Sequence, residues 1–426
     1  MITMENSFKP RVLGQLLPEP SFARLVVITG ARQTGKTTLS REKYRHLKYI
    51  NLDAPENREL VRLLATPQWG ESIGNSIIDE AHKEPSVFEK VKYAFDERQI
   101  TFSVLTGSSQ ILLLRQVRES LAGRAFFYEL WPMMQCELRS IESSTEVAYP
   151  LLASIISEQS VGSALEDVPK RLVVSDDIKY IEAERYLLNW GGMPALLDMS
   201  DAERWTWLKN YGYTYLERDL ADLARLNDLM PFRKFQKLSA LRSSMLLNYS
   251  EIARDTGVSV DTARRYLEYL RISYQTILLQ PYYKNLTSSV VKTPKIFWLD
   301  TGIWRQLTGF RGEITGQIYE SMVVAEIIKW IRTSQCEGEL YFYRTKSGLE
   351  VDLILELPMG CVAMEIKTRE KVTSKDARPV KVLAQSLSDK WLGGLIIYRG
   401  DSIVKLEDPD IWAVPSRRLF QSPVPA

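Results

Sequence analysis

A glycine-rich segment near the amino end carries the residue types that hold nucleotide phosphates. Gly30, Gly35, Lys36 and Thr37 fill the fixed places of the pattern G-x-x-x-x-G-K-[ST], directly after an apolar run that ends at Thr29. The glycines let the backbone curl so that N–H groups point at phosphates, and the following helix turns its positive end toward them. We predict that Lys36 reaches the β and γ phosphates of ATP and that Thr37 holds Mg²⁺. The predicted nucleotide-binding residues of this loop are Gly30, Ala31, Arg32, Gln33, Thr34, Gly35, Lys36, Thr37 and Thr38.

An acidic pair follows Ile77 and Ile78 at the end of a short apolar run. Asp79 offers oxygen ligands for the Mg²⁺, and Glu80 offers a carboxylate that polarises an attacking water. A solvated Asp-Glu pair at a strand end is the alternative, but the phosphate loop favours the hydrolytic interpretation. We therefore predict Asp79 as a metal ligand and Lys36, Asp79 and Glu80 as catalytic residues.

Small polar residues end the next apolar run, at Thr106-Gly107-Ser108-Ser109. A hydroxyl at this place senses the γ phosphate or orients the water. Ser108 is assigned to the nucleotide site on this ground, with Ser109 as an open alternative. The same residues also make an ordinary turn.

Arginines follow this segment. ATPases that act as rings borrow an arginine from the neighbouring subunit to stabilise transition-state charge, and Arg124, Arg115 and Arg118 are candidates for that role. Each of them is also readily explained as a surface residue. Arg124 is assigned to the nucleotide site, and we expect a homo-oligomer.

A second acidic set lies in the last quarter of the chain. Asp352 and the pair Glu365-x-Lys367 fall on adjacent predicted strands, and residues two apart share one face of a strand. Two carboxylates bind Mg²⁺, which activates water, while Lys367 stabilises charge. Glu320, on an amphipathic helix predicted over Gly316–Arg332, adds a third carboxylate that either binds the metal or supports its ligands from behind. Alternating Glu and Lys on a solvated strand face is the alternative.

The segment Asn248–Leu270 has helix-turn-helix spacing. Ser250 is expected to cap a short helix, Gly257 to make the turn, and Ser259 to cap a second helix that bears Arg264 and Arg265. A winged version would use Ile277–Lys284 and Lys295–Leu299 as its strands. Acidic residues on the second helix, Asp261 and Glu268, would repel phosphate, so a structural role stays open beside DNA contact.

Strands alternate with helical or loop segments over the first 130 residues, which predicts an α/β fold with a parallel sheet. The five predicted strands are Leu25–Thr29, Tyr49–Leu52, Ser76–Ile78, Phe102–Thr106 and Phe126–Leu130. In the last quarter the predicted order is helix, three strands, helix, strand, with strands Leu340–Arg344, Leu349–Leu357, Cys361–Lys367 and Gly394–Tyr398 and a second helix from about Ser374 to Leu387.

Composition narrows the class of protein. The chain has 426 residues, 45% of them hydrophobic and 25% charged, as in soluble globular proteins of two or three domains. Its apolar runs are shorter than the roughly 18 residues that span a bilayer, and we expect a cytoplasmic protein without a leader or a membrane partner. Three scattered cysteines are too few for a disulfide framework or a zinc site. His46 and His82 are the only histidines, which argues against a histidine-based metal centre or a Ser-His-Asp triad. The net charge of +2 neither demands nor excludes a nucleic-acid partner.

These motifs, in this order, resemble a large bacterial and archaeal family that joins an AAA-type ATPase domain to a C-terminal domain of poorly defined role. The resemblance implies ATP binding; the apolar run before Asp79 is shorter than such strands usually have. Residues from Gly316 onward resemble the PD-(D/E)XK nuclease superfamily, which contains many members that bind without cutting. The motifs that carry the family resemblance are Gly30–Thr38, Ile77–Ala81, Leu105–Gln110, Ser120–Arg124, Gly191–Pro194, Tyr215–Leu220 and Lys295–Gly302.

We divide the chain into an AAA-type ATPase domain at 1–135, a helical connecting region at 136–235, a winged helix-turn-helix at 236–305 and a restriction-endonuclease-like α/β domain at 306–426. The favoured interpretation is an ATPase that couples Mg-ATP hydrolysis to DNA binding or processing. One rival is a nucleotide-dependent switch or scaffold that binds proteins through an inactive nuclease fold. Another is a regulator that reads an operator while ATP sets its oligomeric state.

Overall fold

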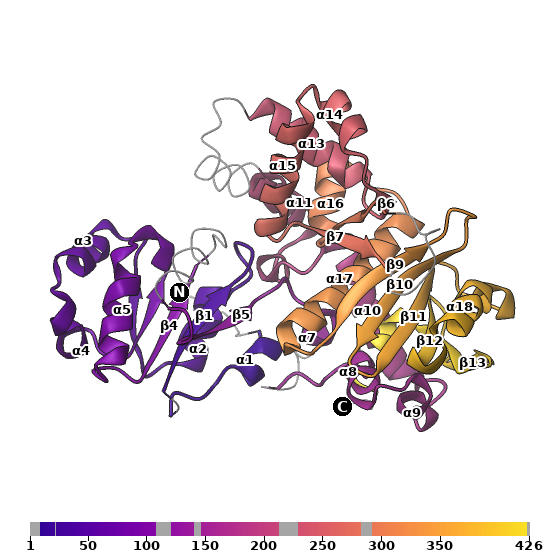
Figure 1. The fold of residues 1–426 in the computed structure, drawn as a ribbon, viewed down its shortest axis with the longest axis horizontal. Helices are drawn as coiled ribbons and strands as arrows, with labels where there is room; N and C mark the ends of the chain where they lie inside the picture. Colours follow the sequence, from indigo (N-terminus) through magenta and orange to yellow (C-terminus); the bar gives the residue numbers. More distant parts are fainter. Residues whose placement is uncertain are drawn as a thin grey trace. The chain divides into compact units, whose positions relative to one another are not determined.

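The computed structural model describes residues 9–21, 23–107, 121–139, 146–212, 229–282 and 292–423 (Figure 1). They form two compact units. Unit 1 takes the described residues of Met1–Pro132 together with Met193–Leu197 and Ile272–Tyr274. Unit 2 takes the rest, which is the larger part of the chain.

A five-stranded sheet forms the centre of unit 1, in the order β2-β3-β4-β1-β5. Every neighbouring pair is parallel, which confirms the predicted α/β class and parallel sheet. Each strand lies within a residue or two of its predicted bounds. The strands are β1 Arg24–Thr29, β2 Lys48–Asn51, β3 Ser76–Asp79, β4 Phe102–Thr106 and β5 Ala125–Glu129.

Helices cover both faces of this sheet, and β1 shows why. Leu25 and Val27 belong to one apolar cluster with Phe88, while Val26 and Ile28 belong to another with Leu39. Successive side chains of a strand point to opposite faces, so an uninterrupted apolar strand needs cover on both. The helices of unit 1 are α1 Val12–Leu16, α2 Lys36–Lys43, α3 Pro55–Leu63, α4 Trp69–Ser72 and α5 Ser86–Asp96, with short 3₁₀ turns at Thr66–Gln68 and Ala81–Lys83.

Unit 2 contains a helix-turn-helix module. Asn248 caps α14 through its side chain, which accepts from the backbone N–H of Glu251 at 3.1 Å. The predicted cap Ser250 is wrong, because this residue already lies inside the first turn. Ser259 accepts from the N–H of Thr262 at 3.1 Å at the start of α15, and Gly257 makes the turn in the left-handed region, as predicted. The module comprises α13 Met230–Leu241, β6 Met245–Leu246, α14 Tyr249–Thr256, α15 Val260–Ile272, β7 Thr276–Pro281 and β8 Lys295–Trp298.

The strands of this module continue into the C-terminal region. β8 pairs antiparallel with both β6 and β7, and β7 pairs in parallel with β9 through Gln280 and Tyr341. The result is one nine-stranded sheet in the order β13-β14-β12-β11-β10-β9-β7-β8-β6. The C-terminal strands are β9 Glu339–Arg344, β10 Glu350–Leu357, β11 Gly360–Lys367, β12 Trp391–Tyr398, β13 Val404–Glu407 and β14 Ile411–Pro415.

The elements predicted for the last quarter are present in the predicted order: α17 Gly316–Ser334, β9 to β11, α18 Ser374–Leu387 and β12. β9, β10 and β11 form an antiparallel meander, and β12 joins β11 in parallel. The prediction that α17 is amphipathic is wrong. This helix is buried on most of its surface because it packs against β8, β11 and α10 at once. The strands β13 and β14 were not predicted.

The remaining helices of unit 2 are α7 Gln135–Arg139, α8 Leu151–Glu158, α9 Val161–Glu166, α10 Val174–Trp190, α11 Asp201–Tyr211, α16 Thr301–Thr308 and α19 Ser416–Leu419. Within the described parts of the chain, no helix has the length and apolar character to cross a membrane.

The cap of α14 gives a test of the helix-turn-helix module. Asn248→Ala removes the side-chain acceptor of the Glu251 N–H and is expected to lower stability by about 1 kcal/mol. Ser250→Ala is the matched control and is expected to change stability by less than about 0.5 kcal/mol. Thermal unfolding of both variants, followed by circular dichroism, makes the measurement. A larger loss of stability in Ser250→Ala than in Asn248→Ala would show that Ser250 is the N-cap residue of α14.

Candidate functional site

The loop between β1 and α2 has the backbone that phosphate binding requires. Gly30 has φ +146°, and a Cβ there would lie 2.1 Å from the carbonyl oxygen of Leu130, so no other residue fits. Gly35 is left-handed at φ +92° and directly precedes α2. The buried Lys36 ammonium folds back to donate to the carbonyl oxygens of Gly30 at 3.0 Å and Ala31 at 2.8 Å. The amino end of α2 and this ammonium therefore face the curl of the loop.

Asp79 lies beside this loop at the carboxyl end of β3. Its Oδ2 accepts from the Thr37 hydroxyl at 2.8 Å, so the two predicted Mg²⁺ ligands lie together. Its Oδ1 accepts from the hydroxyl of Thr106, the last residue of β4. The backbone N–H of Glu80 donates to the same oxygen at 3.2 Å. Asp79 is 5% exposed, and these donors fix both oxygens of its carboxylate.

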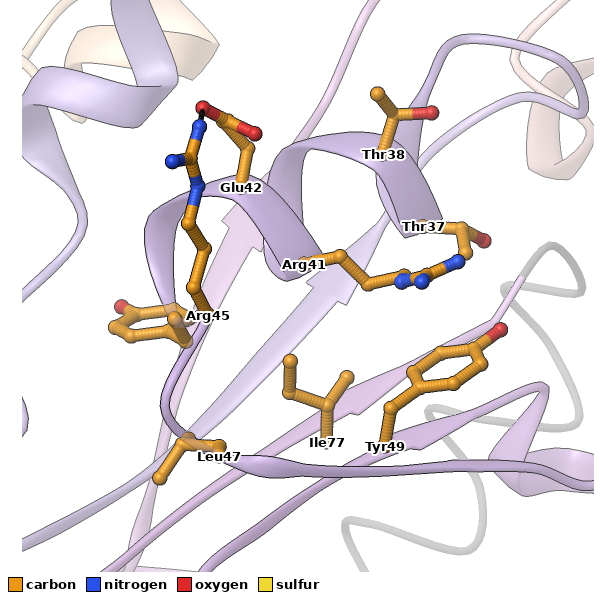
Figure 2. A pocket seen from close by; sticks show the side chains of 9 residues that line it. Thr37, Thr38, Arg41, Glu42, Arg45, Leu47, Tyr49 and Ile77 are labelled. Carbon is orange, nitrogen blue, oxygen red and sulfur yellow. Dashed lines mark hydrogen bonds and ion pairs between the residues drawn. The ribbon is translucent and has the colours of Figure 1, made fainter.

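Tyr49 is a further partner of Asp79 that sequence reasoning missed. Its hydroxyl donates to Oδ2 of Asp79 at 2.8 Å from the neighbouring strand β2. Burial, followed by the hydrogen bond to Asp79, raises the pKa of Tyr49 well above its usual range, so it remains a donor at physiological pH. Figure 2 shows Arg41 of α2 extending toward this ring, and its guanidinium carbon lies 4.8 Å from the ring centre.

These two side chains border a cavity of about 450 Å³ between α2 and the strands β2 and β3 (Figure 2). Its lining is mixed, with hydroxyl, cationic and apolar groups. The lining residues are Thr37, Thr38, Arg41, Glu42, Tyr44, Arg45, Leu47, Tyr49 and Ile77.

Glu80 leaves β3 in a left-handed conformation, with φ +52°. This conformation is unfavourable for a residue with a Cβ and is tolerated where the surroundings enforce it. Its Oε2 lies 3.4 Å from Nδ1 of His82, whose side chain is 7% exposed. The side chain of Glu80 is half-buried and follows Asp79, whose carboxylate and the Thr37 hydroxyl are the oxygen groups that can bind a metal ion. A carboxylate at this place can accept a proton.

Two more buried residues support the loop, and neither was predicted. The guanidinium of Arg11 donates to the carbonyl oxygens of Thr34 at 2.8 Å and of Trp131 at 2.5 Å. Tyr274 belongs to the short segment Ile272–Tyr274 of unit 1, and its hydroxyl lies 2.7 Å from that of Thr29. Thr29 directly precedes Gly30. The loop and the residue before it are therefore held by residues distant in sequence.

Arg124 is predicted to act on the nucleotide of a neighbouring subunit, and in its own chain it pairs with Asp96. Its Nε and Nη2 lie 2.6 and 3.0 Å from the carboxylate oxygens of Asp96. Arg124 precedes β5 at the amino edge of the parallel sheet, whereas the phosphate loop follows β1 at the carboxyl edge. Its action on a neighbouring subunit stays a prediction. Ser108, Ser109, Arg115 and Arg118 lie outside the described residues.

In unit 2 the structure brings Asp352 and the Glu365–Lys367 pair together. Asp352 on β10 accepts from the N–H of Ile366 on β11 at 2.8 Å. Lys367 Nζ lies 2.5 Å from Oε1 of Glu365, while the buried Oε2 of Glu365 has no hydrogen-bond partner. Burial, and then the charge of Asp352, raise the pKa of Glu365 to about 7.

Glu320 does not complete a metal-ligand set with these residues. Its Oε1 lies 3.3 Å from Nζ of Lys295, and Lys295 also lies 2.7 Å from Oε1 of Glu350. Among the residues that the structure describes, no three His, Cys, Asp or Glu side chains are arranged to hold a metal ion. The predicted role of Glu320 in a metal site stays a prediction, and in this structure its carboxylate pairs with the ammonium of Lys295.

Comparisons with known proteins match the chain in three parts. A family profile described as an AAA domain matches residues 23–139. Two profiles described as domains of unknown function, DUF8612 and DUF4143, match residues 181–313 and 315–419. Together with the parallel sheet and the loop, the first match identifies residues 23–139 as an AAA-type P-loop ATPase domain.

Relatives that match more than 90% of this chain occur in bacteria and archaea. The uncharacterized protein Rv2008c of Mycobacterium tuberculosis is 28% identical over 409 residues, covering 93% of this chain and 81% of its own. The uncharacterized protein MJ1544 of Methanocaldococcus jannaschii is 22% identical over 413 residues, covering 91% of this chain and 85% of its own.

Among solved structures, the Walker-type ATPase PABY2304 of Pyrococcus abyssi matches with a TM-score of 0.44 and 16% identity, over 69% of this chain and 94% of that one. The ADP form of the ORC2 protein of Aeropyrum pernix matches with a TM-score of 0.27 and 12% identity, over 60% of this chain and 81% of that one.

Tyr49 provides a test of the site geometry. Tyr49→Phe removes one donor to Asp79 and is expected to weaken Mg²⁺-dependent binding of a fluorescent ATP analogue by about tenfold. Tyr44→Phe removes a hydroxyl that donates to the Pro18 carbonyl oxygen in the same unit, and is the matched control. Equal affinities of the two variants would remove Tyr49 from the site.

Proposed function

We propose that this protein is an ATPase that binds Mg-ATP at the loop between β1 and α2 and couples ATP hydrolysis to DNA binding. The hydrogen bond between Thr37 and Asp79 carries the proposal, because it aligns a hydroxyl and a carboxylate beside the phosphate loop. These are the oxygen ligands that Mg²⁺ takes in P-loop ATPases. The donor set therefore fits this ion, whose charge would offset that of the β and γ phosphates.

The residues in and beside the loop have different roles in ATP binding and hydrolysis. Lys36 exchanges its two carbonyl partners for phosphate oxygens, which keeps its ammonium satisfied in both states. Glu80 accepts the proton of the attacking water, and Thr106 and Tyr49 hold Asp79 in orientation. Thr38 and the backbone from Gly30 to Gly35 line the phosphates. An arginine from a second copy of the chain would complete the site in a homo-oligomer.

DNA binding is assigned to the winged module formed by α13 to β8. Arg264 and Arg265 are exposed on α15, the second helix of the helix-turn-helix, and Arg254 is exposed on α14. The Arg264 guanidinium carbon lies 5.3 Å from the ring centre of Tyr249, which orders it at the surface. Exposed arginines on the second helix are the groups that contact phosphates or base edges in such modules.

The loop and the module are joined by a short stretch of chain. Ser273 and Tyr274 directly follow α15, which ends at Ile272, and precede β7, and Tyr274 contacts the base of the phosphate loop. The ring of Tyr274 meets Trp131 edge-on with centres 4.8 Å apart, and its hydroxyl pairs with Thr29. We expect a change of nucleotide state at Gly30 to reach α15 through this hydrogen bond and the two residues of backbone that follow the helix.

The nucleotide chemistry is tested by two variants. Lys36→Ala is expected to abolish ATP binding, since the cation that faces the phosphates is lost. Glu80→Gln is expected to keep ATP affinity within about twofold while turnover falls at least about 100-fold. ATP turnover and analogue binding measure the two effects. Full turnover in Glu80→Gln would assign the proton acceptor to another residue.

DNA coupling is tested by ATP turnover with linear, single-stranded and branched DNA. Arg264→Ala/Arg265→Ala is expected to weaken DNA binding and to reduce the slope of log affinity against log salt by about 2. Arg271→Ala, on the same helix but 2.7 Å from Glu268, is the matched control. A turnover rate indifferent to every DNA would favour the nucleotide-dependent switch or scaffold that binds proteins.

A further inference from the structure

Lys295 is a charged residue inside unit 2 that neither the nucleotide site nor the DNA surface uses. It lies on β8, and its side chain is 5% exposed. Lysine is almost never buried unless it is paired. Its Nζ lies 2.7 Å from Oε1 of Glu350 on β10 and 3.3 Å from Oε1 of Glu320 on α17. The ammonium therefore bridges carboxylates from two different elements.

The charges around this ammonium are nearly balanced within the described residues. Arg344 lies 3.4 Å from the second oxygen of Glu350, and Lys367 neutralises Glu365. The cluster consists of the carboxylates Glu320, Glu350, Asp352 and Glu365 and of the cations Lys295, Arg344 and Lys367. A divalent ion added to this set would leave an excess of positive charge at a largely buried place, which is costly.

Electrostatics support the bridging role. Burial lowers the pKa of Lys295. The charges of Glu320, Asp352 and Glu350 raise this pKa by a larger amount, so the net shift is upward. Burial and Asp352 raise the pKa of Glu320 to about 7, and Lys295 opposes that rise. Lys295 opposes the upward shift of the pKa of Asp352 in the same way. Its charge therefore favours the ionised forms of both carboxyl groups.

One oxygen of the cluster is left over. Oε2 of Glu365 is buried and has no hydrogen-bond partner, although Glu365 is only 7% exposed. Such an oxygen, near Asp352, is the kind of group that ligates a metal when positive charge is missing. With Lys295 in place, no three-ligand set is formed among the described side chains. Mg²⁺ therefore does not fit the cluster as it stands.

We propose that the ammonium of Lys295 replaces a divalent metal ion in this nuclease-like fold, so that the acidic cluster is stable without metal and does not cleave DNA. The inference is independent of the proposed nucleotide chemistry, which lies in unit 1. It predicts that removal of the ammonium turns Glu320, Asp352 and Glu365 into a divalent-metal site.

The test is calorimetric titration of nucleotide-free protein with Mn²⁺. Wild-type protein is expected to show no Mn²⁺ binding that depends on Asp352. Lys295→Met is expected to gain an Asp352-dependent site whose Mn²⁺ affinity is at least about tenfold above any Mn²⁺ affinity of the wild type at this cluster. Lys295→Met/Asp352→Asn should lose that site again, which separates it from any Mn²⁺ held by Thr37 and Asp79. Lys295→Arg keeps the charge and should gain nothing. Lys381→Met, which removes a lysine of a surface ion pair with Glu407, is the matched control.

Two results would overturn the inference. One is Asp352-dependent binding of Mn²⁺, or Asp352-dependent DNA nicking, by the wild-type protein. The other is a folded Lys295→Met variant that gains no Mn²⁺. Loss of the buried charge partner is expected to lower the Tm by about 5–10 °C. Should that variant fail to fold, Lys295→Gln, which keeps a polar side chain at this position and leaves Glu320, Asp352 and Glu365 in place, is expected to show the same gain.

Discussion

The hydrogen bond between Thr37 and Asp79 joins the helix after the phosphate loop to the acidic end of β3. β4 lies between β1 and β3 in the sheet, so the two segments meet across its carboxyl end, where Thr106 also reaches Asp79. The strand order, the start of α2 and the left-handed Glu80 all have to agree for these atoms to converge. The site depends on the parallel sheet as a whole, because a shift of any one strand would separate a donor from this carboxylate.

The carboxylate of Asp79 in unit 1 and the carboxylates of the cluster in unit 2 have opposite kinds of hydrogen-bond and ion-pair partners. Asp79 is held by neutral donors, which are hydroxyls and a backbone N–H, so its negative charge remains available to an external cation. In unit 2, Glu320 and Glu350 are held by ammonium and guanidinium groups. A carboxylate among neutral donors suits a site that binds and releases a metal, whereas one among cations suits a permanent part of the fold. The kind of donor thus separates two clusters that look alike in sequence.

What could be predicted follows from how local each signal is. The phosphate loop, the five parallel strands and the order of elements after Gly316 are written in short patterns, and the strands fall within a residue or two of their predicted bounds. Tyr49, Arg11 and Tyr274 could not be found, because each reaches the loop through the strand order or through a distant segment. Lys295 was missed as a partner of Glu320 for the same reason, since β8 joins a sheet whose order cannot be read from the chain. The wrong cap at Ser250 was a smaller error of two residues.

The hydroxyl contact between Tyr274 and Thr29 has a consequence for the chain that leads out of α15. While the contact holds, Ser273 and Tyr274 belong to unit 1 and add no free length to the connection between α15 and β7. Released, these two residues supply about 7 Å of extended backbone. The hydroxyl at the end of β1 therefore limits the free length of backbone that follows the helix that bears Arg264 and Arg265.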